Sequence, residues 1–415
     1  MSEGGGTVEQ VRFLGAREAY ARIQIRGAIL LGVTLGIYRF WLATDTRRFL
    51  WANSEIAGET LEYNGTALEL LIGFLAAVAI LVPAYTLVFL AALDLGLLGK
   101  VAYVLAVAGP FAVGQWAVYR ARNYRLTRTI FRGLRFHQDG SALLYALCAV
   151  CWWTLTVLTF GLAYPFQLAS LERFKLRHTL YGDLRASFAG SGTRLFLRGL
   201  PMWLAVCGPL VAAVVIIARA ADWTAISDAV TKGGADVGEK VANSSPGFET
   251  AIGIAALLLV FSVIAALALY PVFQALVLRW WCSGLRFGGI AARSRLRTKA
   301  VYGAYGRLLG FAVLFSIGIS IATSVLAGAI GAVFAKFLPD QQVVVASGLV
   351  LVGYVAAALG YSAIYRIFVV FALWRLGMES LELTGLSALA NVQAAGHPVS
   401  ALGEGLANAL HVESL

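Results

Sequence analysis

Charged residues are scarce in this sequence of 415 residues. Only 13% of its positions are Asp, Glu, Lys or Arg, whereas 60% are hydrophobic and the mean hydropathy is +0.78. Soluble domains carry about 25% charged and about 45–50% apolar residues. A water-soluble protein of the present composition would expose large apolar patches. The composition therefore excludes a soluble enzyme and a disordered chain, and it predicts an all-α polytopic membrane protein.

Cysteine and histidine are also scarce, with four residues of each. Cys148 and Cys151 form a C-x-x-C pair, but it lies in an apolar run without a second pair, which favours buried structural thiols over redox or zinc chemistry. The histidines show no metal-ligand spacing. No phosphate-binding glycine loop, nucleophile elbow or paired acidic motif stands out. The sequence thus predicts no enzyme, no cofactor and no metal.

Long apolar runs divide the chain into three regions. The start, MSEGGGTVEQ, lacks the basic and apolar regions of a cleavable signal peptide. We expect a cytoplasmic N-terminal segment at 1–23, a membrane domain at 24–376 and a cytoplasmic C-terminal tail at 377–415. Eight apolar stretches approach the roughly 20 residues that a membrane helix needs. They lie at 24–43, 68–93, 100–119, 143–164, 195–219, 250–278, 308–335 and 343–373.

The net charge of +11 collects in particular connections. Arginines lie in the first 23 residues and in the connection 44–67, basic residues dominate the connections 120–142, 165–195 and 279–307, and acidic residues dominate 220–249. Eight alternating spans would place 120–142, with its many arginines, outside the cell, against the positive-inside rule. We therefore expect six full transmembrane helices, with 24–43 and 143–164 as re-entrant or interfacial hairpins and both termini cytoplasmic. Eight plain spans remain the alternative.

The two expected hairpins are similar to each other. Thr34-Leu35-Gly36-Ile37-Tyr38 matches Thr159-Phe160-Gly161-Leu162, and an offset near 125 residues also relates Gly58 to Gly182 and Gly65 to Gly190. A partial third copy aligns Tyr164-Pro165 with Tyr270-Pro271. These matches predict parallel internal repeats at about 24–142, 143–290 and 265–376.

Each copy also predicts a short strand-like segment followed by the start of a helix. Leu61 with Tyr63, and Leu134 with Phe136, alternate as a strand does. Thr66, Ser141 and Ser191 each follow a glycine and are expected to be helix N-caps. Thr66 and Glu69 have capping-box spacing, so we interpret Glu69 as part of a cap and not as an intramembrane acid. Asp94 is expected at an outer turn, and Arg198 near the start of a span, where it can reach the interface.

The same motifs carry a resemblance to a known family. TLGIYRFW at 34–41, followed by IAGETLEYNGTALELLIGFL at 56–75, resembles the YjgN-like family of bacterial inner-membrane proteins, which have a domain of unknown function. FRGLRFHQDGSA at 131–142 and LYGDLRASFAGSG at 180–192 are similar to the repeats of that family, whereas GLRFGGIAARSR at 284–295 departs from the pattern. The resemblance covers about 10–395. It implies a multispanning protein of the inner membrane, and it implies no substrate or catalytic residue.

Two functions are consistent with the sequence. We favour a transporter or channel for a small solute or lipid-like molecule, because broken intramembrane segments are costly and are usually retained for a site. The candidate pathway residues are Thr34, Gly36, Tyr38, Thr159, Gly161, Tyr164, Gln167 and Gln274.

The alternative is a non-transport envelope protein that binds anionic lipid or scaffolds a partner through its arginine-rich cytoplasmic face. Its candidate lipid contacts are Arg47, Arg48, Arg122, Arg125, Arg173 and Arg279. Because the basic residues are spread over several loops, the sequence disfavours nucleic acid as a partner.

Overall fold

The long apolar stretches fold as helices. The computed structural model describes residues 8–93, 96–232, 247–337, 342–393 and 400–410. Within these ranges six helical runs are long and apolar enough to cross a membrane, as expected, so the chain is a largely helical polytopic membrane protein. They are α3 (Ala67–Ala91), α4 (Leu97–Arg128), α7 (Gly192–Ala220), α10 (Phe248–Gly284), α11 (Thr298–Phe337) and the continuous run of α12 (Gln342–Tyr365), the π-helical turn η2 (Arg366–Val370) and α13 (Phe371–Glu379).

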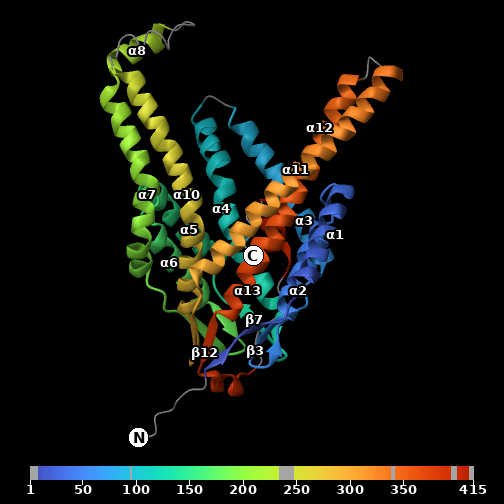
Figure 1. Cartoon of the computed structure of the whole chain (residues 1–415). Coiled ribbons are helices and arrows are strands. Elements are labelled where there is room, and N and C mark those ends of the chain that lie inside the picture. Colours follow the sequence, from blue (N-terminus) through green and yellow to red (C-terminus); the bar gives the residue numbers. More distant parts are fainter. Residues whose placement is uncertain (1–7, 94–95, 233–246, 338–341, 394–399, 411–415) are drawn as a thin grey trace.

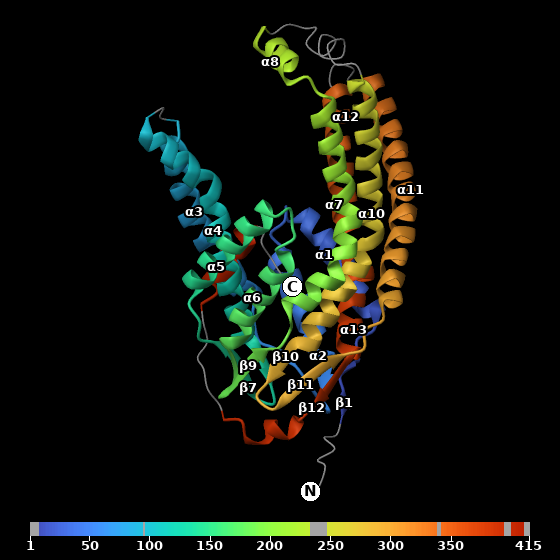
Figure 2. The same cartoon turned by 90° about the vertical axis from the view of Figure 1, so that its left-hand side faces the viewer.

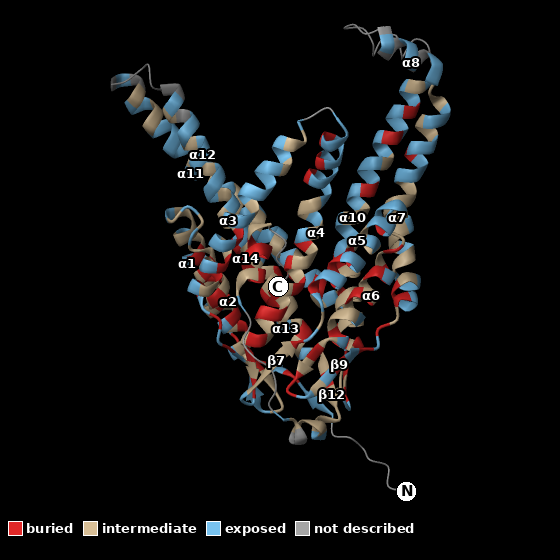
Figure 3. Ribbon diagram, turned by 180° about the vertical axis from the view of Figure 1, so that it is seen from behind, coloured by how far each residue is buried: buried red, intermediate tan, exposed pale blue. Residues whose placement is uncertain are grey.

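The spans form three antiparallel pairs that diverge from one end of the molecule (Figures 1 and 2). α3 pairs with α4, α7 with α10, and α11 with α12, while α8 (Trp223–Lys232) follows α7 at the far end. Little of their surface is buried within the chain (Figure 3), and none of the most apolar window of α11 is. Such exposed apolar surface requires a lipid environment.

Both segments expected to form hairpins are broken by a turn. The turn at 34–38 joins α1 (Arg17–Val33) to α2 (Arg39–Ala52), and the turn at 159–163 joins α5 (Ala142–Leu158) to α6 (Tyr164–Arg177). Neither segment is among the six candidate crossings of the described residues, because 24–43 is not one helix and the 17 residues of α5 are short for a crossing.

The two turns have the same backbone conformation. Leu35 and Phe160 have φ +50°, and each precedes a glycine of still more positive φ, Gly36 at +91° and Gly161 at +87°. The Thr34 hydroxyl donates to the Leu30 carbonyl at 2.7 Å, and it accepts from a backbone N–H four residues on. The Thr159 hydroxyl makes the same two bonds. Left-handed φ is unfavourable for a side chain with a Cβ, so these threonine bonds and the glycine together stabilise each reversal.

The strand-like segments expected from the sequence belong to a set of short strands that pair with one another. In chain order they are β1 (Glu9–Gln10), β2 (Arg12–Phe13), β3 (Ser54–Ile56), β4 (Glu59–Thr60), β5 (Glu62–Tyr63), β6 (Thr129–Phe131), β7 (Leu134–Gln138), β8 (Thr179–Tyr181), β9 (Leu184–Phe188), β10 (Leu285–Phe287), β11 (Ile290–Ser294) and β12 (Leu381–Thr384). Nine of them pair antiparallel in the order β1-β12-β11-β10-β9-β8-β7-β6-β5, and the other three pair as β2-β3-β4.

These two ladders join into a closed barrel. The segment 9–13 contains β1, which pairs with β12, and β2, which pairs with β3. The segment 59–63 contains β4, which also pairs with β3, and β5, which pairs with β6. The backbone N–H of Val11 donates to Leu381, and that of Leu61 donates to Ser54. Each of these two extended segments therefore carries the pairing from one ladder to the other, and the strands form a ring without a free edge.

The barrel has an apolar interior. Val11, Leu61, Phe136, Phe287 and other apolar side chains from around the ring line a cavity of about 180 Å³. The 3₁₀ helix η3 (Leu386–Asn391) contributes Leu386 and Leu389 to its wall, and it lies across the base of the strands in Figure 2. The barrel is thus a packed module at one end of the helices, with alternate residues of each strand facing inward.

A recurring junction connects helix ends to the barrel. The backbone N–H groups of Leu14, Asn64, Asp139, Ala189 and Arg295 donate to the carbonyls of Asn53, Arg128, His178, Gly284 and Ser380, respectively, each at or next to the end of a helix. Glycine is needed beside three of these donors, since a Cβ on Gly15, Gly65 or Gly190 would lie within 2.7 Å of the aromatic ring two residues before it.

The predicted N-caps at the starts of three helices are confirmed. The hydroxyls of Thr66, Ser141 and Ser191 accept from backbone N–H groups three residues on, at 3.3 to 3.4 Å. The carboxylate of Glu69 does not complete a capping box in the structure; it accepts from Tyr124 at 2.6 Å and pairs with Arg128 at 2.9 Å. Because the side chain reaches across to α4, it links two spans at their barrel end.

Parts of the expected N-terminal segment 1–23 and of the expected C-terminal tail 377–415 pack into the fold. Residues 9–13 belong to the barrel and Arg17 begins α1, while residues 1–7 lie outside the described ranges. At the other end β12 closes the ring, and α14 (Leu402–Ala409) packs between α3 and α4. The small residues of α14 permit this insertion, because a bulkier segment would not fit between two spans that also contact each other.

Candidate functional site

The residues of the expected transport pathway are not brought together. The hairpin of α1 and α2 and the hairpin of α5 and α6 lie on opposite sides of the molecule in Figures 1 and 3. Gln167 is buried and accepts from Thr156 at 2.7 Å, and Gln274 accepts from Tyr305 on α11. Gly161 and Tyr164 line an apolar groove, described below. The eight residues thus have local partners or local turn roles.

Most of the arginines expected to contact lipid are used inside the protein. Arg48 donates to the Gly65 carbonyl and Arg173 to the Gly190 carbonyl, each at 3.0 Å and each 17 residues away. Arg122 donates to Gln138 at 2.6 Å and Thr179 at 2.9 Å. These side chains hold helix ends to strands. The prediction treated clustered arginines as surface groups, whereas Arg48 and Arg173 bind loop carbonyls and Arg122 binds side chains of β7 and β8.

Arg47 and Arg125 face a carboxylate that the sequence analysis missed. Glu404 of α14 is 1% exposed, and it forms an ion pair with Arg47 and lies 3.8 Å from Arg125 Nε. Arg47 also donates to the hydroxyl of Tyr63 at 3.2 Å. Burial alone would lower the pKa of Arg47, but Glu404 and Tyr63 outweigh it and raise the pKa above its ordinary value. The ion pair is a structural link between α2 and α14.

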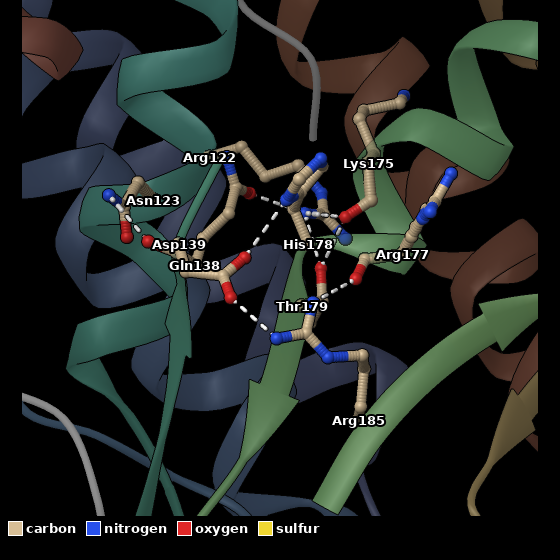
Figure 4. Close-up of polar contacts among 9 residues, drawn as sticks. All are labelled: Arg122, Asn123, Gln138, Asp139, Lys175, Arg177, His178, Thr179 and Arg185. Carbon is tan, nitrogen blue, oxygen red and sulfur yellow. Dashed lines mark hydrogen bonds and ion pairs between the residues drawn. The ribbon is translucent and has the colours of Figure 1, made fainter. Parts of the chain in front are cut away.

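A second polar cluster lies where α4 and α6 meet β7 and β8 (Figure 4). Asp139 contacts His178 at 3.0 Å and accepts from Arg185 at 2.7 Å. Burial would raise the pKa of Asp139, but these two partners lower it below its ordinary value. Arg122 donates to Gln138 and Thr179, Arg185 donates to the Arg177 carbonyl, and Thr179 donates to the Lys175 carbonyl, so the cluster holds the barrel to the helices.

A basic pocket lies on the outside of the barrel, where α7 begins and α10 ends. It encloses about 720 Å³, and its walls come from these two helices, from β11 and β12, and from the loop before α7. Its lining includes six arginines and a single carboxylate, Glu382. The arginines are Arg194, Arg198, Arg279, Arg286, Arg293 and Arg295.

The charges of the basic pocket are only partly compensated. Arg295 pairs with Glu382 at 2.8 Å, and Arg286 donates to three backbone carbonyls. Arg279 donates to Thr298 at 3.1 Å, while its buried Nε has no hydrogen-bond partner among the described residues. Within the same ranges, the side chains of Arg194, Arg198 and Arg293 make no hydrogen bond or ion pair and are exposed. The pocket therefore has guanidinium donors available for an anion.

The walls of the basic pocket are fixed by two contacts. Trp280 of α10 donates to the Ser191 carbonyl at 3.0 Å, and Arg173 donates to the neighbouring Gly190 carbonyl. A Cβ on Gly190 would approach the rings of Phe188 and Trp280 too closely, so the loop depends on glycine. These contacts set the distance between the start of α7 and the end of α10. The cations on the two helices are thus held around one space before a ligand arrives.

Only Arg279 of the basic pocket belongs to the lipid contacts expected from the sequence. Arg198, which was expected to reach the membrane interface, is part of the wall of the basic pocket. The sequence does place the other arginines of the pocket on common faces. Arg194 and Arg198 are about one helical turn apart, and Arg293 and Arg295 are two residues apart, as side chains on one face of an extended segment are. What the sequence does not contain is the pairing of β9 with β10, and of β10 with β11, that places β11 beside the start of α7.

The expectation for the cysteine pair is wrong, and the expectation for Asp94 concerns a residue that the structure does not describe. Cys148 and Cys151 were expected to be buried, but both are exposed on α5, because that face of the helix has no neighbour within the chain. Asp94 lies outside the described residues. Among the residues that are described, no group of three His, Cys, Asp or Glu side chains could hold a metal ion.

Comparison with known proteins places the chain in one family. The family model of DUF898, a bacterial protein family of unknown function, matches residues 8–409. This is the YjgN-like family, so the resemblance seen in the motifs is confirmed. No curated protein and no solved structure matches the chain.

Proposed function

Because the chain belongs to the DUF898 family, whose function is unknown, we propose a function from its basic pocket: binding of the phosphate headgroup of an anionic lipid, without catalysis. The observation that carries the proposal is the convergence of six arginines on one cavity at the ends of two membrane helices. Basic pockets between membrane helices are suited to anionic headgroups. Arginine is suited to phosphate because its planar fork donates two parallel hydrogen bonds.

The position of the basic pocket favours a lipid over a soluble anion. Arg194 and Arg198 lie in the first two turns of α7, and Arg279 lies in the last two turns of α10, beyond the apolar part of both spans. The headgroup layer lies at this level of a membrane helix. We rank this function above transport, because the expected pathway residues lie on opposite sides of the molecule.

The headgroup proposal is tested by removing two exposed arginines. We expect Arg194→Gln/Arg198→Gln to reduce retention of phosphatidylglycerol by the purified protein about fivefold for each lost cation, because a surface cation contributes about 1 kcal/mol to binding of anionic lipid. Native mass spectrometry in detergent, with phosphatidylcholine as the neutral reference, measures the ratio of bound lipids.

The matched control is Arg177→Gln/Arg297→Gln, which also removes two exposed arginines but outside the basic pocket. If only the cations of the pocket contribute about 1 kcal/mol each to binding, this control should keep the ratio of bound phosphatidylglycerol to phosphatidylcholine within twofold of the ratio for the unmodified protein. Equal losses in both variants, or no loss in either, would contradict a specific headgroup site.

We further infer that the protein lies in the bacterial inner membrane with the barrel and both termini on the cytoplasmic side. The arginine-rich helix ends gather at the barrel, and the acidic connection 220–249 lies in the sequence between the far ends of α7 and α10. The hairpin tips are apolar and exposed, Leu35 by 94% and Phe160 by 77%. These exposures support hairpins that enter the membrane from the barrel side.

Orientation is tested by labelling an exposed position of the barrel. Arg132 lies at the tip of the hairpin between β6 and β7 and is exposed. In a variant without the four native cysteines, Arg132→Cys should react with a membrane-impermeant maleimide only after the cells are opened. A cysteine at Trp223, on α8 at the far end, is the positive control and should react in intact spheroplasts. The opposite pattern would overturn the proposed orientation.

The repeated geometry supports the proposed parallel duplication. The bonds of Arg48 to Gly65 and of Arg173 to Gly190, and the turns at Gly36 and Gly161, are each related by 125 residues. We infer that one ancestral unit, a hairpin followed by a strand and a span, was copied in the same orientation. The basic pocket then belongs to the second copy and to the strands of the third.

A further inference from the structure

The second cavity on α7 and α10 is an apolar groove beside the basic pocket. It encloses about 330 Å³ and is walled by α6, α7, α10 and the turn at Gly161. Its lining includes Phe196, Trp203, Leu269 and Phe273. Trp203 donates to the Phe160 carbonyl at 2.8 Å, so the hairpin turn is fastened to α7 as part of the wall.

The groove and the basic pocket are neighbours on the same two helices. On α7 the pocket reaches Arg198 and the groove begins at Phe196 and Gly199; on α10 the pocket reaches Leu276 and the groove begins at Phe273. Three residues of helix correspond to about 4.5 Å along its axis. From there the groove continues away from the barrel to Ala266 of α10, about 15 Å from Leu276.

This order of charge and apolar surface matches the two parts of a lipid. A phosphate in the basic pocket would lie at the aqueous end of the helices, and a chain attached to it would run along the groove toward the middle of the membrane. Resting on the headgroup function proposed above, we propose that the ligand is an anionic lipid whose acyl chain occupies this groove. The charged pocket selects the head, and the apolar groove distinguishes a lipid from a free phosphate.

Gly199 offers a way to fill the groove without disturbing the helix. It lines the groove, and a Cβ built on it would meet no atom within 4 Å. Gly199→Leu therefore places a side chain in space that the proposed acyl chain needs. Gly253→Leu is the matched control, since Gly253 of α10 is equally open and lies outside the groove.

The experiment uses phosphatidylglycerol with a diazirine midway along one acyl chain, in vesicles of phosphatidylcholine. We expect photocrosslinks on groove residues of α7 and α10, about fivefold more than with the same diazirine on phosphatidylcholine, as one favourable cation contact would give. Gly199→Leu should lose these crosslinks and Gly253→Leu should keep them. Glycerol 3-phosphate in excess should not displace the lipid if the chain contributes to binding.

The outcomes separate the two proposals. If crosslinks spread evenly over all lipid-facing helices while phosphatidylglycerol is still preferred in native mass spectrometry, the groove is wrong and the headgroup site stands. If both labelled lipids crosslink the groove equally, the groove holds bulk lipid and the selective ligand is wrong. If glycerol 3-phosphate displaces the lipid completely, the site binds a phosphate and not a lipid, and the chain proposal is overturned.

Discussion

Replacing Glu404 with alanine is expected to lower the free energy of unfolding by about 3–5 kcal/mol, the cost of removing one partner from a buried ion pair. Glu404 and Arg47 are 1% and 8% exposed, and Arg125 lies close to the same carboxylate. Without Glu404 the charge of Arg47 stays buried, with the hydroxyl of Tyr63 as its hydrogen-bond partner among the described residues. Unfolding of the detergent-solubilised protein, followed by circular dichroism against denaturant, measures the loss.

Two further variants distinguish this effect from a general loss of charge. Glu379→Ala breaks the exposed pair of Arg375 and Glu379, and it should cost no more than about 0.5 kcal/mol because exposed pairs on one helix contribute little. Arg47→Met/Glu404→Met removes both buried charges and should recover most of the loss. If Glu404→Ala and Glu379→Ala are equally mild, the buried pair does not hold α14 in place.

The second large effect is expected from Gly405→Ala. A Cβ at Gly405 would lie 2.0 Å from the backbone carbonyl of Gly73 on α3 and 2.3 Å from the nitrogen of Phe74. These are backbone atoms, so no side-chain rotation can relieve the clash and the two helices must separate. We expect a loss of about 3 kcal/mol, at the upper end of what overpacking costs, measured by the same denaturation and by faster proteolysis of the chain after residue 393.

Gly253→Ala is the matched control for this clash. It makes the same change within a helix, but nothing lies within 4 Å of the new methyl group. It should stabilise the protein by about 0.5–1 kcal/mol, because alanine is the better helix former. If the two glycine variants behave alike, the close contact of α14 with α3 does not contribute to stability.

The sequence was sufficient for the features that depend on local composition. The six spans follow from the length of apolar runs, and the N-caps of Thr66 and Ser141 follow from a hydroxyl after a tight turn. The breaks at Gly36 and Gly161 were likewise visible, because glycine in an apolar stretch admits the left-handed backbone that a reversal needs.

The remaining features depend on partners far apart in the chain. The strands are only two to five residues long; alternation indicated those at Leu61–Tyr63 and Leu134–Phe136, but most strands are stabilised by pairing with a distant segment. Glu404 lies 357 residues from Arg47, within a glycine- and alanine-rich segment that resembles a tail. The basic pocket was missed for the same reason: its arginines come from separate segments that the packing of α7 on α10 and the pairing of β9 with β10 bring together.

The closed ring of strands also determines when the protein can become complete. Glu9 of β1 pairs with Leu383 of β12. β1 is translated before all six spans, and β12 is translated after them. The three helix pairs therefore enter the membrane while the barrel still has two open edges, and open edges are sites for pairing with another chain. We therefore expect the barrel to close only when nearly all of the chain has been translated.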